Sequence, residues 1–359
     1  MSSPLHADVP PGPAGTVASF SARERWALLG ASLWLVTGLQ LDAFAHSTIP
    51  DLETFWTPWH AVLYSGIAVC GLTLLWLLRP RLPEVITYRS IVHQTPPALR
   101  LPVVGMALLL VGGGIDTLWH NLFGIEDGLE IFLSPSHFLI IIGMVLVACG
   151  PALMLAASSG RRLPGGDATL LAISALLAAL PVHIFTAHAS ALEEPLLGTG
   201  AESMETFSLD AQMMHGYVGS TVVLLLPILI VARRWYLTVG VPTVLVAVPA
   251  FLMAMVQGDG DVWLPATLAI ATAVVEVVAR VAAPAVRSLG PDVPWMVLGL
   301  LGPIVAWGAV LAVGNVVVGV GWNLHLVTGI LALTGLTGLA TTFLVRRVRV
   351  APAAVPAAS

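Results

Sequence analysis

Two stretches of the sequence repeat one arrangement of ionisable side chains. They read LDAFAHSTIPDLETFWTPWH (41–60) and IDTLWHNLFGIEDGLEIFLSPSH (115–137). Each holds an Asp, a His four residues later and, after a loop, the pattern Glu-x-Phe-x-Ser/Thr-Pro-x-His. The matched residues are Asp42 with Asp116, His46 with His120, Glu53 with Glu130, Phe55 with Phe132, Thr57 with Ser134, Pro58 with Pro135, and His60 with His137. This agreement in residue type and order indicates a duplicated unit.

The spacing in both stretches is typical of a metal site. An Asp and a His four residues apart lie on one helical face, about a turn from each other. The Ser/Thr-Pro pair predicts the start of a helix, so the last His of each stretch falls in its first turn. One carboxylate and two imidazoles suit copper, zinc or non-haem iron. The predicted ligands are Asp42, His46 and His60 in the first site and Asp116, His120 and His137 in the second, with Glu53, Glu126, Asp127 and Glu130 as hydrogen-bond acceptors for the imidazoles or as additional ligands.

Fainter copies of the unit follow. His183 and His188 end one apolar run, Glu-Thr-Phe recurs at 205–207 and His215 opens the next run, so His188 and His215 are further candidate ligands. A fourth copy, GDGDVWLPA (258–266), and a fifth, with Asn315 and His325, retain less. For His183 and His325 alone, a polar residue at the membrane interface is the favoured interpretation. The chain is interpreted as five copies of one helix-loop-helix unit.

These elements must lie in a membrane. The chain is 57% hydrophobic and 10% charged, with a mean hydropathy of +0.91. Its apolar runs approach the length of about 20 residues that crosses a bilayer, and they are too continuous for barrel strands. An all-α integral membrane protein is predicted. The ten expected spans are 26–46, 60–78, 100–120, 137–157, 168–188, 215–233, 239–257, 263–284, 294–318 and 325–345. The run Gly112-Gly113-Gly114 before Asp116 predicts close helix packing.

Arginine sets the expected orientation, because the chain has no lysine and its 15 arginines lie in the two tails and every second loop. By the positive-inside rule these segments are cytoplasmic, which gives a cell-membrane protein with both termini inside and five outward hairpins. Residues 1–25 are expected to be a disordered tail and 351–359 a second cytoplasmic tail; 26–157 hold the duplicated hairpins and 158–350 the remaining ones. A signal peptide cleaved after AFA (43–45) is the alternative for the N-terminus. The net charge of −5 gives no indication of a nucleic-acid partner.

The pattern Asp116-x3-His120, followed by FLSPSH from Phe132 to His137, resembles a metal-binding segment of the copper membrane monooxygenases, the particulate methane and ammonia monooxygenase family. In that family the segment belongs to one of the membrane-embedded subunits. The resemblance covers roughly 40–145. It implies copper at Asp116, His120 and His137, where dioxygen would be activated, and a second, neighbouring site at Asp42, His46 and His60. It also implies a small apolar substrate and partner membrane subunits; a homo-oligomer is the alternative. The longer loop before His137 and the ten expected spans depart from the family.

Three other classes of function fit the same residues. A membrane zinc metallohydrolase acting on lipid-like substrates would need an open metal position, and Ser65, Ser134 and Ser136 could assist it. A metal transporter would need polar residues continuing through the membrane, and within the expected spans Glu276 is the main example. In a non-catalytic subunit the metal would only join the hairpins.

Overall fold

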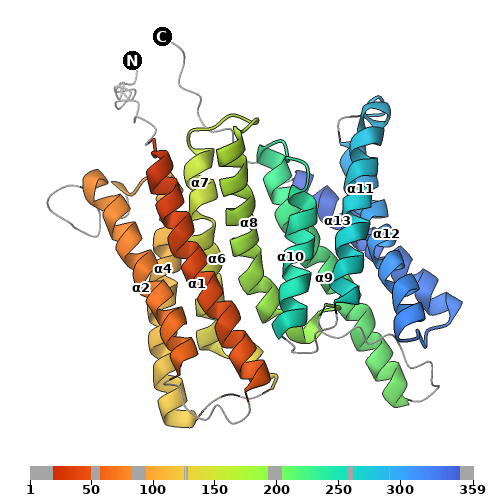
Figure 1. Ribbon diagram of the computed structural model, residues 1–359, viewed down its shortest axis with the longest axis horizontal. Coiled ribbons are helices and arrows are strands. Elements are labelled where there is room, and N and C mark those ends of the chain that lie inside the picture. The colour runs from red at the N-terminus through yellow and green to blue at the C-terminus, as the bar shows by residue number, and fades with distance from the viewer. Residues whose placement is uncertain are drawn as a thin grey trace, which may run out of the picture.

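The computed structural model describes residues 19–49, 57–82, 94–124, 126, 128–192, 204–256, 262–290 and 292–347. Within these ranges the chain is all-helical, without strands. The elements are α1 (Ala22–Thr48), α2 (Pro58–Leu78), η1 (Arg79–Arg81), α4 (Pro97–Phe123), α5 (Glu130–Leu133), α6 (Pro135–Ala148), α7 (Gly150–Ala156), α8 (Gly165–Phe185), η2 (Ala187–Ala189), α9 (Met204–Arg234), α10 (Val241–Val256), α11 (Trp263–Arg287), α12 (Val293–Val317) and α13 (Leu324–Arg347). Figure 1 shows α1, α2, α4 and α6 on one side and α10 to α13 on the other.

Among the described residues, nine helices are long and apolar enough to cross a membrane, with α6 and α7 counted as the single span Pro135–Ala156. The segment expected as a tenth span, 239–257, contains α10, which has 16 residues. At 1.5 Å per residue such a helix is about 24 Å long, shorter than the hydrocarbon core of about 30 Å. The structure therefore supports the prediction of an all-helical, multi-pass membrane protein, with nine candidate spans in the part of the chain that it describes.

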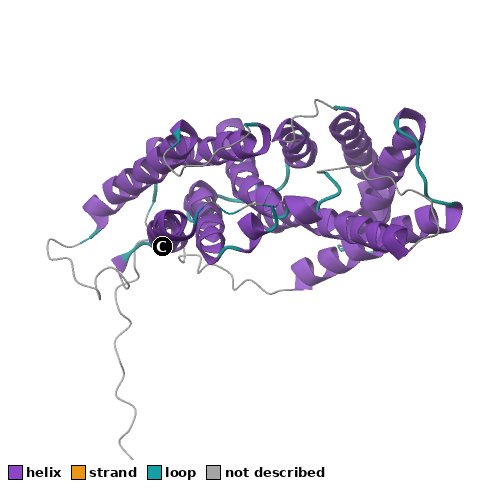
Figure 2. Cartoon of the chain, turned by 90° about the horizontal axis from the view of Figure 1, so that it is seen from below, coloured by secondary structure: helices purple, strands orange, loops and turns teal. Residues whose placement is uncertain are grey.

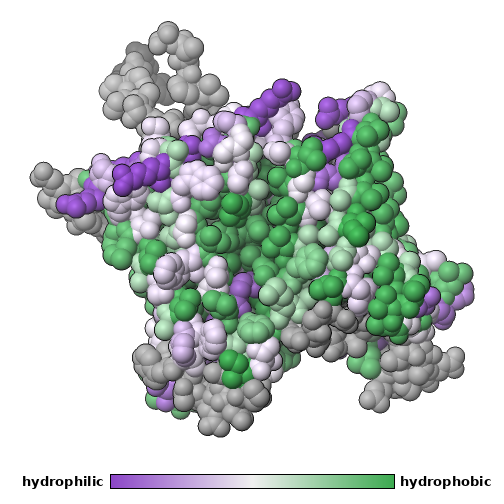
Figure 3. Space-filling view, in the orientation of Figure 1, coloured by the Kyte–Doolittle hydropathy of each residue, from purple (hydrophilic) through white to green (hydrophobic). Residues whose placement is uncertain are grey.

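The outer surface of the helices is strongly apolar. Large hydrophobic side chains such as Leu72, Leu110, Val281 and Leu344 are each more than 60% exposed. Figure 3 shows green hydrophobic surface between hydrophilic patches at the two ends of the helices. Exposed apolar surface of this extent is unfavourable in water. A surrounding bilayer removes that penalty, which agrees with the spans assigned above.

Arginine contacts hold several helix ends together. Arg81 pairs with Glu24 at 2.7 Å, which joins the end of α2 to the start of α1, and Arg25 pairs with Asp167 at 3.0 Å, which joins α1 to α8. Arg234 at the end of α9 donates to the carbonyl oxygens of Ala156 and Ser159. Arg280 pairs with Glu276, and Arg346 with Asp292. We call this end of the molecule, along the upper edge of Figure 3, the arginine face.

Glycines let the hairpin helices pack closely at equivalent positions of the duplicated unit. A Cβ on Gly38 of α1 would stand 2.7 Å from Leu63 Cα of α2, and one on Gly66 of α2 would stand 2.6 Å from Leu35 Cα. The equivalent glycines of α4 and α6, Gly112 and Gly143, lie equally close: a Cβ on Gly143 would stand 2.7 Å from the Gly105 carbonyl oxygen. Within the predicted glycine run, Gly112 and Gly113 make such close contacts, whereas Gly114 faces open space. Four residues separate each of Gly38 and Gly112 from the Asp that follows, so this packing sets the distance between each Asp and the opposite helix.

The span Pro135–Ala156 is broken near Cys149, because Pro151 has no N–H to donate. Ser174 of α8 inserts at the break. Its hydroxyl donates to the Ala148 carbonyl at 2.7 Å and accepts from the Ala152 N–H at 3.3 Å. These are the two groups that would bond each other in a regular α-helix. The serine therefore satisfies both within the apolar interior, as membrane helices require.

Two apolar cores divide the bundle. One is formed by α1, α2, α4 and α6, with Leu35, Leu63, Leu109 and Met144 at its centre. The larger core lies mainly among α8 to α13. Viewed from below in Figure 2, the helices form an array that is wider than it is deep. The first core fixes the helices that carry the duplicated Asp and His residues.

Candidate metal centres

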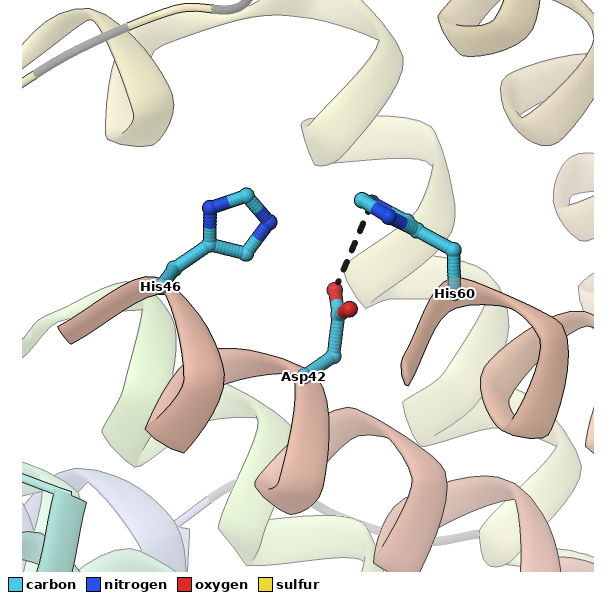
Figure 4. Close-up of side chains that lie close together, drawn as sticks. All are labelled: Asp42, His46 and His60. Atoms are coloured by element: carbon cyan, nitrogen blue, oxygen red, sulfur yellow. Dashed lines mark ion pairs between the residues drawn. The ribbon is translucent and has the colours of Figure 1, made fainter. Parts of the chain in front are cut away.

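The first triad lies where α1 ends and α2 begins. Asp42 and His46 come from the last two turns of α1, and His60 from the first turn of α2. His60 Nε2 is 3.6 Å from Asp42 Oδ2, and the rings of His46 and His60 are 5.4 Å apart. Figure 4 shows all three side chains pointing into one space. One ligand atom from each lies within 4.8 Å of the others.

Thr57 orients His60. It is the N-cap of α2, as the Thr-Pro pair predicts, and its hydroxyl accepts from the His60 N–H at 3.1 Å. The same hydroxyl lies 2.9 Å from His60 Nδ1. Because Nδ1 is held at the helix start, Nε2 is directed toward Asp42. A hydrogen bond that fixes one ring nitrogen while the other faces a carboxylate is typical of metal-ligating histidines.

Asp42 also has an unsatisfied oxygen. Its side chain is buried, with 9% of the residue exposed. Within the described residues, Asp42 Oδ1 has no hydrogen-bond partner. A buried carboxylate without compensation is costly, so this oxygen requires a proton or a cation. The position of the two imidazoles makes a metal ion a suitable group to meet that requirement.

The second triad is tighter and includes a fourth side chain. His137 Nε2 lies 3.0 Å and His120 Nε2 3.5 Å from the same oxygen, Asp116 Oδ1. Glu126 Oε2 lies 3.5 Å from His120 Nε2 and 3.9 Å from His137 Nε2. Ligands about 2.1 Å from a tetrahedral ion lie about 3.4 Å from one another. The observed separations bracket this value, so the four side chains fit a single ion.

The tautomers of both histidines also fit a metal ion. His120 Nδ1 lies 3.1 Å from the Gly124 carbonyl oxygen, and His137 Nδ1 lies 2.6 Å from that of Ile131. A carbonyl oxygen only accepts, so each Nδ1 carries a proton. In the neutral imidazole, each Nε2 then presents a lone pair to the Asp116 carboxylate. Two lone pairs facing one buried carboxylate repel it, unless protons or a cation lie between them.

The predicted acidic helpers are placed differently. Glu126 is at the second triad, and its Oε2 is buried without a hydrogen-bond partner among the described residues. Glu130 is exposed at the start of α5. Glu53 and Asp127 lie outside the described residues. Of these four, Glu126 is the side chain that the structure places beside a triad.

Two side chains that the sequence did not assign to the metal position Asp116. The Tyr64 hydroxyl donates to Asp116 Oδ2 at 3.1 Å, and the Ser136 hydroxyl donates to Asp116 Oδ1 at 3.1 Å. Ser136 is itself 2.8 Å from the Ser134 hydroxyl. The sequence pointed to these serines only as helpers in hydrolysis. Tyr64 follows His60 by four residues, and this spacing was the available signal, since it places both on one face of α2.

Tyr64 also shows that the two triads are neighbours. His60 belongs to the first triad, and Tyr64, one turn later on the same helix, bonds to the second. The charges of Asp42 and His60 interact electrostatically with Asp116, His120 and His137. Two ions bound in these sites would therefore influence each other.

The third predicted pair is not assembled in this way. His188 lies on η2, exposed, with its ring 4.7 Å from that of Phe132. His215 is exposed on α9. In the part of the chain that the structure describes, neither belongs to a group of three or more side chains able to hold one ion. His183 is buried, and its Nε2 has no hydrogen-bond partner among those residues.

Comparison of the chain with protein-family models, with curated proteins and with solved structures gives no match. Inference about function therefore rests on the two triads, on the residues that orient them and on their place in an apolar helical bundle.

Proposed function

We propose that the protein is a membrane copper protein that oxidises a small apolar substrate with dioxygen. The observation that carries the proposal is the second triad, where two histidines fixed through Nδ1 direct Nε2 at one buried carboxylate oxygen. A carboxylate with imidazoles suits copper, zinc and non-haem iron alike. Copper is chosen because the spacing of Asp116, His120 and His137 resembles that of the copper membrane monooxygenases.

The residues of the second triad have distinct roles in this proposal. Asp116, His120 and His137 hold the ion, and a reduced copper ion bound there would supply the activation of dioxygen. Tyr64 and Ser136 fix the Asp116 carboxylate through hydrogen bonds to its two oxygens. Glu126 stands beside both imidazoles and is available as a further ligand. The first triad would bind a second copper ion close enough to exchange electrons with the first.

An apolar substrate has a short route to this site from lipid. Leu122 and Phe123, next to His120 at the end of α4, are 65% and 70% exposed, and Leu133 is 59% exposed. These side chains face the surroundings of the bundle. A small apolar molecule dissolved in the bilayer would meet them before it reached the ligands, and water would be disfavoured there.

The arrangement in the membrane is part of the proposal. We infer five outward hairpins with α10 as the short tenth span, both termini in the cytoplasm and the arginine face inside, by the positive-inside rule. Asp42 follows the start of α1 by 20 residues, about 30 Å along a helix. The metal sites would then lie near the extracytoplasmic surface. Labelling of single cysteines placed at Ser159 and Ser47 from the two sides of sealed vesicles tests this, since labelling of both from one side would contradict it.

One contact supports a second candidate function, a membrane zinc metallohydrolase acting on lipid-like substrates. The linked hydroxyls of Ser134 and Ser136 reach the metal-binding carboxylate, where they could assist attack by a zinc-bound water. Ser65, the third serine considered, is instead bonded to the Val62 carbonyl and the Trp34 indole. The resemblance to the copper enzymes makes oxidation the preferred proposal.

Elemental analysis of protein purified without added metal tests the proposal. Two copper ions per chain are expected, falling to one in Asp42→Ala and in His137→Ala, with His325→Ala as the matched control because His325 is exposed on α13. Copper-loaded protein should also consume dioxygen in the presence of a reductant and a small alkane or alkene. Zinc at one or two per chain would favour the hydrolase, and absence of bound metal would refute both.

A further inference from the structure

A cavity lies in the second half of the chain, apart from the triads. Its volume is about 810 Å³, within the range of pockets that hold small molecules. It is lined by residues of α9 to α13 and extends to the arginine face. Nothing in the proposed metal chemistry uses it.

The interior of the cavity is apolar. Its walls include Leu224, Ile228, Leu268 and Leu298. Two polar side chains in its lining satisfy each other, since Trp307 Nε1 donates to Thr221 Oγ1 at 2.8 Å and the Thr221 hydroxyl donates to the Tyr217 carbonyl at 2.7 Å. The interior therefore suits hydrocarbon, because a polar occupant would lose its hydrogen bonds to water there.

The mouth of the cavity is cationic. Four arginines line it, namely Arg161, Arg280, Arg287 and Arg346, against one carboxylate, Glu276. Arg280 is paired with Glu276, and Arg346 with Asp292. Among the described residues, Arg161 and Arg287 form no ion pair. Arg161 lies over the ring of Tyr236, an aromatic residue of the kind that marks the headgroup level of a bilayer.

We propose that the cavity binds one anionic phospholipid, with an acyl chain in its interior and the phosphate at Arg161 and Arg287. Guanidinium groups bind phosphate oxygens through paired, charge-assisted hydrogen bonds. The apolar interior accounts for the acyl chain, which a free phosphate ion would lack. Both halves of the ligand are thereby matched within one cavity that opens at the membrane surface.

Charge argues against a second copy of the chain as the occupant. Such a partner would have to offer carboxylates to Arg161 and Arg287. The described carboxylates of the arginine face are Glu24, Asp167, Glu276 and Asp292, and each is already ion-paired with an arginine. An anionic lipid brings its own unpaired charge.

Native mass spectrometry of the delipidated full-length chain tests the proposal. Dioleoyl phosphatidylglycerol and dioleoyl phosphatidylcholine share their acyl chains and differ in net charge. One phosphatidylglycerol should bind in preference to phosphatidylcholine. A double variant, Arg161→Gln with Arg287→Gln, should weaken phosphatidylglycerol by about fivefold per arginine and leave phosphatidylcholine unchanged. Arg23→Gln is the matched control, since Arg23 lies over Trp76 on α1, away from the cavity.

A second variant tests the acyl-chain part. A Cβ at Gly302, in the cavity lining, would stand 3.7 Å from Val275 Cγ1, an ordinary contact, so Gly302→Phe should fold and fill the space. It should lower binding of both lipids, whereas Gly30→Phe, at an exposed glycine of α1 with open space around it, should not. Equal binding of the two lipids, displacement of phosphatidylglycerol by inorganic phosphate alone, or dimers that Gly302→Phe dissociates in the absence of lipid would each overturn the proposal.

Discussion

Replacement of Gly143 by Ala tests whether glycine packing sets the geometry of the second triad. A Cβ at position 143 would stand 2.7 Å from the Gly105 carbonyl oxygen and 3.0 Å from the Leu109 nitrogen, both backbone atoms of α4. Unstrained contacts between carbon and carbonyl oxygen are about 3.3 Å or longer. The helices α4 and α6 must therefore move apart by about 0.6 Å to accommodate one methyl group.

This movement exceeds what a metal site tolerates. Asp116 and His120 are on α4 and His137 is on α6, six residues before Gly143 and about 9 Å along the helix. Ligand distances in metal sites hold to about 0.2 Å. We expect the copper affinity of the second site to fall by about ten- to a hundredfold, the range seen when groups that orient ligands are removed. The helix itself should persist, because Ala favours a helix over Gly by about 1 kcal/mol.

The assay is titration of apoprotein with copper against a chromophoric chelator, read separately for the two sites. The first site should keep its affinity in Gly143→Ala. The reverse pattern is expected for Gly66→Ala, where the Cβ would stand 2.6 Å from Leu35 Cα in the packing of α1 against α2. Gly114→Ala is the matched control on α4, because that position faces open space two residues before Asp116. Unchanged affinity in Gly143→Ala, or an equal loss in Gly114→Ala, would refute the reasoning.

Three further substitutions probe single contacts. Tyr64→Phe removes the hydroxyl that donates to Asp116 and should weaken copper at the second site about ten- to a hundredfold in the same titration; the argument fails if exposed Tyr236→Phe has the same effect. Thr57→Val removes the cap of α2 and the contact to His60 Nδ1, so the first site should lose affinity and the unfolding free energy should fall by about 1 kcal/mol; a loss confined to the second site would contradict this. Ser174→Ala leaves the Ala148 carbonyl and the Ala152 N–H unbridged and should lower the unfolding free energy in detergent by about 1–3 kcal/mol; no change relative to exposed Ser47→Ala would count against it.

Local features of the sequence were sufficient for the helices and for the six ligands of the two triads. Apolar runs of bilayer length predict spans because a chain in lipid must satisfy its backbone within each helix. The Asp-x3-His spacing predicts a shared face, and Thr-Pro predicts a helix start, both from rules that act within a few residues. The structure brings together the side chains that these rules selected.

Contacts between distant residues were decided by packing. Nothing in the spacing distinguishes Glu126, which lies beside two histidines, from Glu130, which is exposed four residues later. Tyr64 reaches Asp116 across 52 residues only because α2 and α4 lie side by side. The faint third copy shows the same limit: His188 and His215 follow the repeat, yet no described carboxylate joins them in a common group. The type and spacing of residues specify which groups can face one way along a helix, whereas the approach of two helices depends on every side chain and glycine between them.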